Sequence, residues 1–438
     1  MPKKNPFWWE EAPPRTFAPE PLTLATDVAV VGGGYTGLSA ALTLARQGRS
    51  VQVFDRMRPG EGASTRNGGI ASGSLRPSHA KMARQFGKQR ADAVLIEAKA
   101  AREYLAGLIR EEKIACDFQM TGRFTGAATD KDYEDLAREA DLLSKMLGIE
   151  AHVVPASEQQ SILGTDFYAG GLYRGDIGGL HPGKLHAELL RLALEAGVRV
   201  HGQTGVQGVR GEGNGFELAT ARGGTRARSV IMATNGYTDG VDRWLRRRMV
   251  PVRSRIIATA PLSGNLMRQL MPRGVMCGET RKMHYYYRPS PDGQRILFGG
   301  RDGSIEGDPC WPTRGLQKAL ADIFPELQDV EITHSWFGHV AMNRDMIPRI
   351  FSRRGVRYAA GYCGSGVVWA TWAGRKTALQ LLQSEDGHSA LDFRPPAAVP
   401  LYNGWPWFMP VVSGWMTLQD RIGALRRRSK SSPTVRRP

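Results

Sequence analysis

Residues 26–55 read TDVAVVGGGYTGLSAALTLARQGRSVQVFD, and this stretch decides the fold. Its first six residues, TDVAVV, form a valine-rich run that is typical of a strand buried on both faces. Glycines follow at once, and residues 38–47 then have the composition of a helix that ends at Gly48. The run SVQVF (50–54) predicts a second strand. This order of elements predicts a parallel βαβ unit.

Three glycines between the first strand and the helix, Gly32, Gly34 and Gly37, fit the pattern G-x-G-x-x-G. Such glycines allow a tight turn, the close approach of a pyrophosphate and the packing of the helix on the strand. The helix N-terminus offers free N–H groups to the anion. Asp55 ends the second strand, where a carboxylate accepts ribose hydroxyls and repels a 2′-phosphate. The pattern predicts NAD or FAD rather than NADP, and its alternative is a glycine turn without a ligand.

Composition places the 438 residues among ordinary globular proteins, because 41% are hydrophobic and 23% are charged. No apolar run reaches about 18 residues, and the N-terminus lacks the apolar core of a secretory signal. Four cysteines lie far apart, without the spacing of metal ligands. They argue against a disulfide scaffold and a zinc site, and they fit a reducing cytoplasm.

The C-terminal tail carries much of the positive charge. Seven basic residues and one acid lie between Asp420 and Pro438, which accounts for +6 of the net charge of +17. They follow an aromatic stretch, LYNGWPWFMPVVSGWM (401–416), that two prolines interrupt. Tryptophan and arginine together predict peripheral attachment to the inner face of the cell membrane. The alternative is packing on the body or against another copy. No element typical of nucleic-acid binding accompanies the tail.

The remaining chain divides into helical and strand-like segments. We expect helices over 79–113, as one helix or two, over 131–147 and over 184–196, and buried strands over 198–201 and 229–234. Alternating, aromatic residues between about 250 and 335 predict an antiparallel sheet. A last strand (356–362) leads into a glycine turn and a final helix. This alternation predicts two interleaved domains.

Five further segments suggest a family. They are GEGASTRNGGI (60–70), HPGKL (181–185), ATNGYT (233–238), WFGHVAMNRDMIPRI (336–350) and AAGYCGSGV (359–367). Over roughly residues 24–390 the chain resembles the D-amino-acid oxidase (DAO) superfamily of FAD-dependent amine oxidoreductases, and within it the γ-glutamylputrescine oxidoreductase-like branch. The resemblance implies FAD at the fingerprint, without a covalent bond, because Arg66, Asn67 and Gly338 stand where relatives carry attaching residues.

The resemblance implies an α/β fold in which a Rossmann-type FAD-binding domain is interleaved with an antiparallel-sheet α+β substrate domain. The FAD-binding domain would comprise residues 25–80, 176–248 and 336–395, and the substrate domain residues 81–175 and 249–335. An extended N-terminal arm (1–24), which Trp8 and Trp9 would attach to the body, and an aromatic and basic tail (396–438) would flank them.

The same resemblance implies a set of cofactor residues. The pyrophosphate would meet Gly32, Gly34, Tyr35, Thr36 and Gly37, and the adenosine ribose Asp55 with Arg56. The flavin side would be lined by Ser64, Thr65, Arg66, Asn67, Gly68 and Gly69, the adenine would meet Val206, and the flavin's pyrimidine end would lie near Gly364, Ser365, Gly366 and Val367. An exposed polar loop is the alternative for Arg66 and Asn67.

The substrate strand of the family corresponds to HYYYR (284–288). Side chains alternate along a strand, so Tyr285 and Tyr287 share one face, and we expect that face to meet the substrate. His339, in the element that approaches the flavin, completes the catalytic candidates. The alternatives are core packing for the tyrosines and a structural role for the histidine.

The chain departs from the family at the substrate carboxylate. Sarcosine oxidases bind it with an arginine and a lysine, and here Gly69 and Val368 stand at those places. A carboxylate therefore needs another arginine, and the candidates are Arg76, Arg281 and Arg288. The lysine that activates oxygen in these relatives is also missing, and Leu297 stands in its neighbourhood, so oxygen and a membrane quinone are both open as electron acceptor.

The implied function is FAD-dependent oxidation of a C–N bond in an amine or N-substituted amino acid. Hydride transfer to the flavin and hydrolysis of the imine would yield an amine and an aldehyde or glyoxylate. Iminodiacetate-like and N-methylamino acid substrates are favoured, and γ-glutamylputrescine is the alternative. An aromatic hydroxylase or halogenase would carry a G-D turn where this chain reads GYCGSGV. A non-catalytic dinucleotide-binding or membrane partner protein is the alternative of another class.

Overall fold

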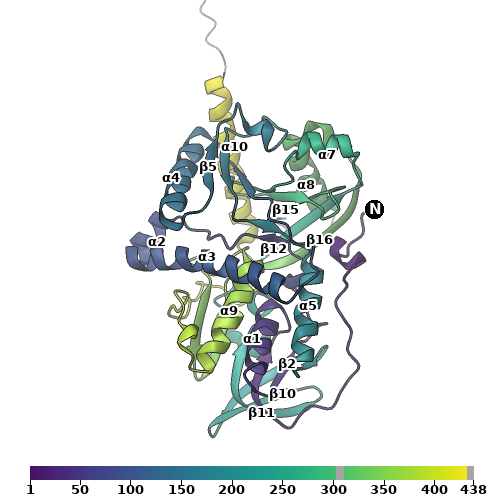
Figure 1. The fold of residues 1–438 in the computed structure, drawn as a ribbon, viewed down its shortest axis with the longest axis vertical. Helices are drawn as coiled ribbons and strands as arrows, with labels where there is room; N and C mark the ends of the chain where they lie inside the picture. Colours follow the sequence, from purple (N-terminus) through teal and green to yellow (C-terminus); the bar gives the residue numbers. More distant parts are fainter. Residues whose placement is uncertain (302–309, 432–438) are drawn as a thin grey trace, which may run out of the picture.

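The computed structural model describes residues 1–301 and 310–431, which form two sheets linked by connections that cross between them (Figure 1). The first sheet lies in the lower half of Figure 1 and the second in the upper half. The chain passes between the sheets several times, as the interleaved domains predicted.

The first sheet contains the predicted βαβ unit. Its parallel core is confirmed: β1 pairs in parallel with β2 and with β11, and β2 with β8. The strands follow the spatial order β17 (Arg349–Arg353), β18 (Val356–Ala360), β11 (Gly223–Met232), β1 (Ala25–Val31), β2 (Val51–Phe54) and β8 (Arg199–His201), with the hairpin β9 (Val206–Glu212) and β10 (Gly215–Thr220) beside β11.

Four helices cover one face of this sheet and share its largest core. They are α1 (Tyr35–Ala45), α3 (Lys88–Glu111), α5 (Pro182–Glu195) and α9 (Gly366–Leu381). Helix α9 crosses α1 at Gly374, where a Cβ atom would lie 2.3 Å from the carbonyl oxygen of Thr36. The Ser39 hydroxyl donates to the Thr371 carbonyl at 2.7 Å, which fixes the same crossing. Only a glycine permits this approach.

The second sheet is mostly antiparallel, and this prediction is also confirmed. Its spatial order is β16 (Ile332–Met342), β12 (Val250–Thr259), β15 (Ile296–Arg301), β14 (Tyr286–Pro289), β13 (Met276–Glu279), β4 (Arg123–Gly126), β6 (Gly171–Arg174) and β5 (Ala151–Val154). Helices α7 (Gly264–Leu270) and α8 (Cys310–Ile323) pack on one face, and α4 (Asp130–Leu147) packs against β5 and β6.

Two details differ from the predicted domain limits. The limit at residues 335 and 336 falls inside β16, because β16 pairs with β12 from Ile332 to Met342. Helix α3 was expected in the substrate domain, but its apolar residues share the core of α1 and α9. Gly87, with φ of +87°, separates α3 from α2 (His79–Phe86), so the long helical region is two helices.

The N-terminal arm is attached to the body, as Trp8 and Trp9 predicted. The Trp8 ring is fully buried, and its Nε1 donates to the Asn67 carbonyl at 2.8 Å. Trp9 Nε1 donates to the Thr65 hydroxyl at 2.9 Å. Lys3 pairs with the first residues of β16, because its N–H donates to the Thr333 carbonyl. The arm then follows one side of the molecule toward β1 (Figure 1).

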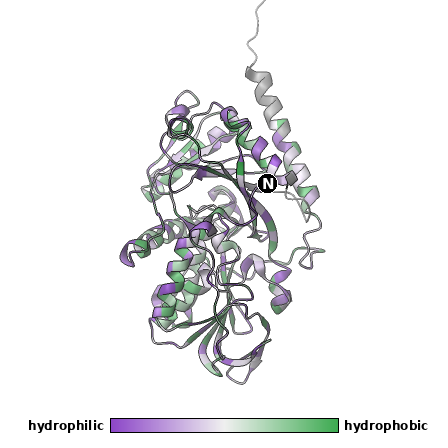
Figure 2. Cartoon of the chain, turned by 90° about the vertical axis from the view of Figure 1, so that its right-hand side faces the viewer, coloured by the Kyte–Doolittle hydropathy of each residue, from purple (hydrophilic) through white to green (hydrophobic). Residues whose placement is uncertain are grey.

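The C-terminal tail forms α10 (Met409–Ser431), which lies against the outside of the second sheet's half of the molecule (Figures 1 and 2). Pro410 occupies the first turn, where the missing N–H costs no helical hydrogen bond. Among the described residues, no helix is long and apolar enough to cross a bilayer.

Candidate active site

A cavity of about 740 Å³ lies where the carboxyl ends of β1, β2 and β11 meet the second sheet. Both sheets contribute to its walls, and so do the loop 56–68, the turn 362–367 and one residue of α10, Met416. Open α/β sheets bind long ligands at this edge. The cavity therefore joins the predicted cofactor residues to the expected substrate strand.

The glycine turn after β1 leaves room for an anion. Gly32 has φ of +111°, and a Cβ there would lie 2.8 Å from the Ala233 carbonyl oxygen. A Cβ on Gly34 would lie 2.8 Å from Ser64 Oγ. The first residue of α1, Tyr35, directs its N–H to Ser64 Oγ at 3.0 Å. The N-terminal end of α1 thus faces the cavity, where its dipole favours a phosphate.

Asp55 closes the nucleotide end. One carboxylate oxygen accepts the Gly33 N–H at 2.8 Å and the other accepts the Met57 N–H at 2.9 Å. Burial raises the pKa of Asp55 to about 6. Each oxygen keeps a second lone pair for a ribose hydroxyl. Arg56 lines the cavity and pairs with Asp239, and Val206 lines the same end.

The loop 60–69 forms the middle of the cavity wall. Ser64, Arg66, Asn67 and Gly68 line the cavity, whereas Thr65 and Gly69 do not. Thr65 instead donates to the Gly60 carbonyl at 2.9 Å, and the Gly69 N–H donates to Asn67 Oδ1 at 2.8 Å. These two residues therefore fix the conformation of the loop without lining the cavity.

The second glycine turn faces the loop 60–69 across the cavity. Gly364 has φ of +105°, and Gly364, Ser365, Gly366 and Val367 all line the cavity at the start of α9. Two helix N-termini, those of α1 and α9, thus open into one space. Together with Asp55 and the room left by the glycines, they fit FAD: the N-terminus of α1 would hold its diphosphate, and the turn before α9 would lie near its flavin.

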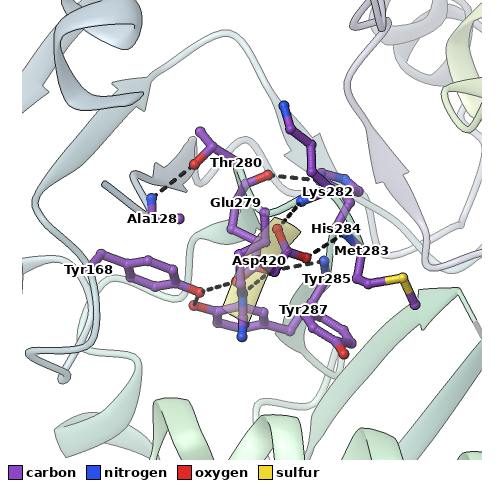
Figure 3. Close-up of polar contacts among 11 residues, drawn as sticks. Ala128, Tyr168, Glu279, Thr280, Lys282, Met283, His284, Tyr285, Tyr287 and Asp420 are labelled. Carbon is purple, nitrogen blue, oxygen red and sulfur yellow. Dashed lines mark hydrogen bonds and ion pairs between the residues drawn. The ribbon is translucent and has the colours of Figure 1, made fainter. Parts of the chain in front are cut away.

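The face of the HYYYR segment that meets the cavity is not the face that was expected. Tyr287 is fully buried, packs with Phe298 and Phe324, and shares a 3.1 Å hydrogen bond with the Tyr168 hydroxyl (Figure 3). Tyr285 stacks on Phe298 and lies outside the cavity lining.

Their neighbours His284 and Tyr286 line the cavity instead. The expectation for Tyr285 and Tyr287 is therefore wrong in geometry. Alternation defined two faces correctly, but the larger apolar core on the far side attracts Tyr287. The same two-residue period would have found Tyr286 if the opposite face had been chosen, whereas His284 precedes β14 and has φ of +45°.

His284 is held as a neutral imidazole. Its Nδ1 lies 2.8 Å from the Glu279 carbonyl oxygen, which can only accept, so Nδ1 carries the proton and Nε2 carries the lone pair. Burial, with help from Arg76 and Arg123, lowers the pKa of His284 well below its ordinary value. His339 also lines the cavity, beside the ring of Tyr237. Tyr237 was not singled out in the sequence, although it lies in the ATNGYT segment.

The three arginine candidates for a carboxylate have different environments. Arg281 forms two hydrogen bonds with the buried carboxylate of Glu279, so its charge is already neutralised. Arg288 donates to the carbonyls of Gly69 and Leu180, both at 2.8 Å, and lies outside the cavity lining. Arg76 lines the cavity, and its Nε donates to the Cys363 carbonyl at 3.0 Å.

Replacing Asp55 by alanine should weaken FAD binding by about 1–3 kcal/mol, because ribose hydroxyls and two backbone N–H groups lose an acceptor. The measurement is titration of the apoprotein with FAD, followed by flavin fluorescence. Asp27→Ala, which alters a carboxylate on β1 outside the cavity lining, is the matched control. An unchanged dissociation constant for Asp55→Ala would mean that the ribose is bound elsewhere.

Comparisons with known proteins agree with this site. The family model described as DAO, FAD dependent oxidoreductase, matches residues 27–380. The chain is 31% identical to probable oxidoreductase OrdL of Rhizobium meliloti (strain 1021), over 95% of this chain and 97% of that protein. It is 30% identical to gamma-glutamylputrescine oxidoreductase of Escherichia coli (strain K12), over 92% and 94%.

Among solved structures, glycine oxidase from Geobacillus kaustophilus superposes with a TM-score of 0.72 at 22% identity, covering 87% of this chain and all of that one. That likeness shows the shared fold. The family match extends from β1 to the penultimate residue of α9, and so includes both glycine turns. The chain belongs to the DAO family of FAD-dependent oxidoreductases.

Proposed function

We propose that this FAD-dependent amine or amino-acid oxidoreductase acts on N-substituted amino acids, with iminodiacetate-like and N-methylamino acid secondary amines as the favoured substrates. When bound, FAD supplies the hydride acceptor. The residues of the chain then have to hold the substrate carboxylate, orient the amine and keep its nitrogen unprotonated. The imine that forms is hydrolysed by water to an amine and an aldehyde or glyoxylate.

The observation that carries this proposal is the position of Arg76. Its guanidinium lies beside the second glycine turn, since a Cβ on Gly364 would be 3.1 Å from Arg76 Nη2. Burial lowers the pKa of Arg76, yet no described carboxylate pairs with it. A guanidinium offers a fork of donors that matches a carboxylate. We assign Arg76 to the carboxylate of the carbon that is oxidised.

The positive charge of the cavity also favours the reactive form of the amine. A nearby cation disfavours a second cation, so the arginines lower the pKa of a bound ammonium group. The lone pair that a neutral amine then carries assists removal of hydride from the adjacent carbon. His284 and Tyr286 both line the cavity, and His284 Nε2, which carries the lone pair, would accept an N–H of that amine. We propose these two as positioning residues.

γ-Glutamylputrescine is the second candidate, and its support is the Escherichia coli relative of that name at 30% identity. Its putrescine end is a primary amine and carries no carboxylate. A cavity lined by arginines disfavours binding of that amine in its protonated form, but not in its neutral form. Secondary amino acids remain the first candidate because they bring a carboxylate close to the oxidised carbon.

The test is anaerobic bleaching of the flavin with a panel of amines. N-methylamino acids and iminodiacetate should bleach it, and Arg76→Gln should raise the concentration needed for half of the maximal bleaching rate about tenfold or more. Arg228→Gln, an exposed residue of β11, is the control for net charge. Bleaching by γ-glutamylputrescine alone would replace the proposal by the second candidate.

We also propose that FAD is bound without a covalent link. Arg66 lies under Trp9 and donates to the Glu61 carbonyl, and Gly338 has no side chain. Cys363 lines the cavity, but its thiol donates to the Gly361 carbonyl and burial raises its pKa to about 11. A protonated thiol is a poor nucleophile.

Acid precipitation of the purified protein should therefore leave the yellow colour in the supernatant, because denaturation releases a cofactor that is held only by non-covalent contacts. A pellet that stays yellow after washing would contradict the proposal. The absorbance of the supernatant near 450 nm, about where oxidised flavins absorb, quantifies the released FAD.

We propose, third, that α10 attaches the protein to an anionic membrane surface. Four apolar side chains repeat at helical spacing on its outward face, with exposed fractions of 74% for Val411, 61% for Trp415, 47% for Leu418 and 41% for Ile422. On the opposite face Ser413 is buried, and Met416 contacts Arg301 of β15. The next turns of α10 contain Arg426, Arg427, Arg428 and Lys430.

An apolar stripe followed by arginines fits a bilayer surface, where each cation adds about 1 kcal/mol of attraction. The side chains of 421 and 424–431, and all of residues 432–438, lie outside the described part of the chain, so the basic segment enters here from sequence alone. The alternative was that the aromatic stretch packs on the body. The four residues of the stripe do not do so, because their side chains are exposed.

Liposome co-sedimentation tests this attachment. Full-length protein should sediment with vesicles that contain phosphatidylserine, and less so at high salt, because both apolar burial and charge contribute. The double variant Trp415→Glu/Leu418→Glu should lose sedimentation with an unchanged melting temperature. Gln419→Glu adds charge on the same helix beside the stripe and serves as control. Failure of the unaltered protein to sediment at low salt would refute the attachment.

A further inference from the structure

The end of the cavity beyond the two glycine turns contains an unusual concentration of cations. Arg76 follows the short strand β3 (Ile70–Ala71), Arg123 begins β4 and Arg301 ends β15, and all three line the cavity. Burial lowers the pKa of each guanidinium. His284 lines the same cavity, and the charges of all three arginines help to lower the pKa of its imidazole.

Three other arginines with little exposure pair with carboxylates, and the buried Arg288 donates to backbone carbonyls instead. Arg102 and Arg174 both contact Asp176, and Arg281 contacts Glu279. By contrast, Arg123 and Arg301 form no ion pair with a described carboxylate, and the buried Nε atoms of both lack a hydrogen-bond partner. Within the described part of the chain, Arg301 Nη1 donates to Met416 Sδ at 2.8 Å and to the Lys282 carbonyl at 3.5 Å.

The structure makes room for these side chains. A Cβ on Gly278 of β13 would lie 2.1 Å from Arg123 Nη2, so the guanidinium rests against the glycine backbone. Asp420 of α10 accepts the N–H groups of Lys282 and Met283 at 2.8 and 3.0 Å, and thereby fixes the loop beside His284 (Figure 3). The same helix places Met416 against Arg301. Arg123 is therefore held against β13, and Arg301 against α10.

Guanidinium groups that are partly shielded from water and have no ion-pair partner are costly, and an anionic ligand offsets that cost. The diphosphate of FAD belongs to the opposite end of the cavity, at α1. One substrate carboxylate at Arg76 leaves two guanidinium groups unmatched. A second carboxylate, bound by two arginines, would satisfy them with charge-assisted hydrogen bonds.

Resting on the proposed function, we infer that the substrate is a secondary amine with two carboxylates. Arg76 binds the carboxylate next to the oxidised carbon, and Arg123 with Arg301 binds the carboxylate of the other nitrogen substituent. The pair of arginines then selects dicarboxylic amines over N-methylamino acids.

Ether analogues test the inference, because they cannot be oxidised as amines. Diglycolate carries two carboxylates and methoxyacetate carries one, and homologues of diglycolate with one longer arm cover other spacings. Isothermal titration of the FAD-loaded enzyme should show at least one of these dicarboxylates binding about tenfold or more tightly than methoxyacetate. Equal affinities throughout would overturn the inference.

Variants then assign the preference to the two arginines. Arg301→Gln and Arg123→Gln should bring dicarboxylate affinity down toward that of methoxyacetate and leave methoxyacetate binding unchanged. Arg301→Lys, which keeps the charge, should retain part of the preference, and Arg228→Gln should retain all of it. Thermal melting and FAD content identify a misfolded variant, and the comparison of ligands on the unaltered enzyme needs no variant.

The outcomes separate the two proposals. If N-methylamino acids bleach the flavin and no dicarboxylate is preferred, the inference fails and the proposed function stands. If dicarboxylates bind tightly and no secondary amine bleaches the flavin, the proposed function fails. If Arg123→Gln and Arg301→Gln lower FAD content and spare ligand affinity, these arginines serve the cofactor, and the inference fails.

Discussion

The arrangement of the cofactor half depends on two contacts at which backbone meets backbone. A Cβ on Gly37 would lie 1.9 Å from the Gly32 carbonyl oxygen, and one on Gly374 would lie 2.3 Å from the Thr36 carbonyl oxygen. These two contacts stack the turn after β1, helix α1 and helix α9 in direct succession. Because both helices start at the same cavity, the distance between their N-termini is set by glycines and not by side chains that could repack.

That constraint explains which parts of the fold could be predicted from sequence. The fingerprint at residues 32–37 and the acid at Asp55 are local patterns whose spacing has a physical cause, so they fixed the βαβ unit and its edge correctly. The antiparallel sheet followed from alternation between residues 250 and 335. The limit between domains at residue 335 could not be found in this way, since β16 continues through the WFGHV element without a break in its pairing.

The substrate end was less predictable, because its members come from distant strands. Alternation in HYYYR defined two faces but not which one meets the cavity, and the buried core around Phe298 decided in favour of Tyr287 facing away. Arg123 and Arg301 carried no local signal, since a lone arginine on a strand is usually solvated. Only the pairing of β4 with β13, and of β14 with β15, brings them to one space.

The N-terminal arm has a consequence for how the protein is made. Lys3 pairs with residues of β16, and Trp8 donates to the Asn67 carbonyl in the loop 60–69, which forms part of the cavity wall. Lys3 thus has its final partners at Thr333 and Ser335, which are synthesised long after it. The cofactor loop cannot be completed during translation of the first domain segment, so this protein should acquire its flavin only after most of the chain has emerged.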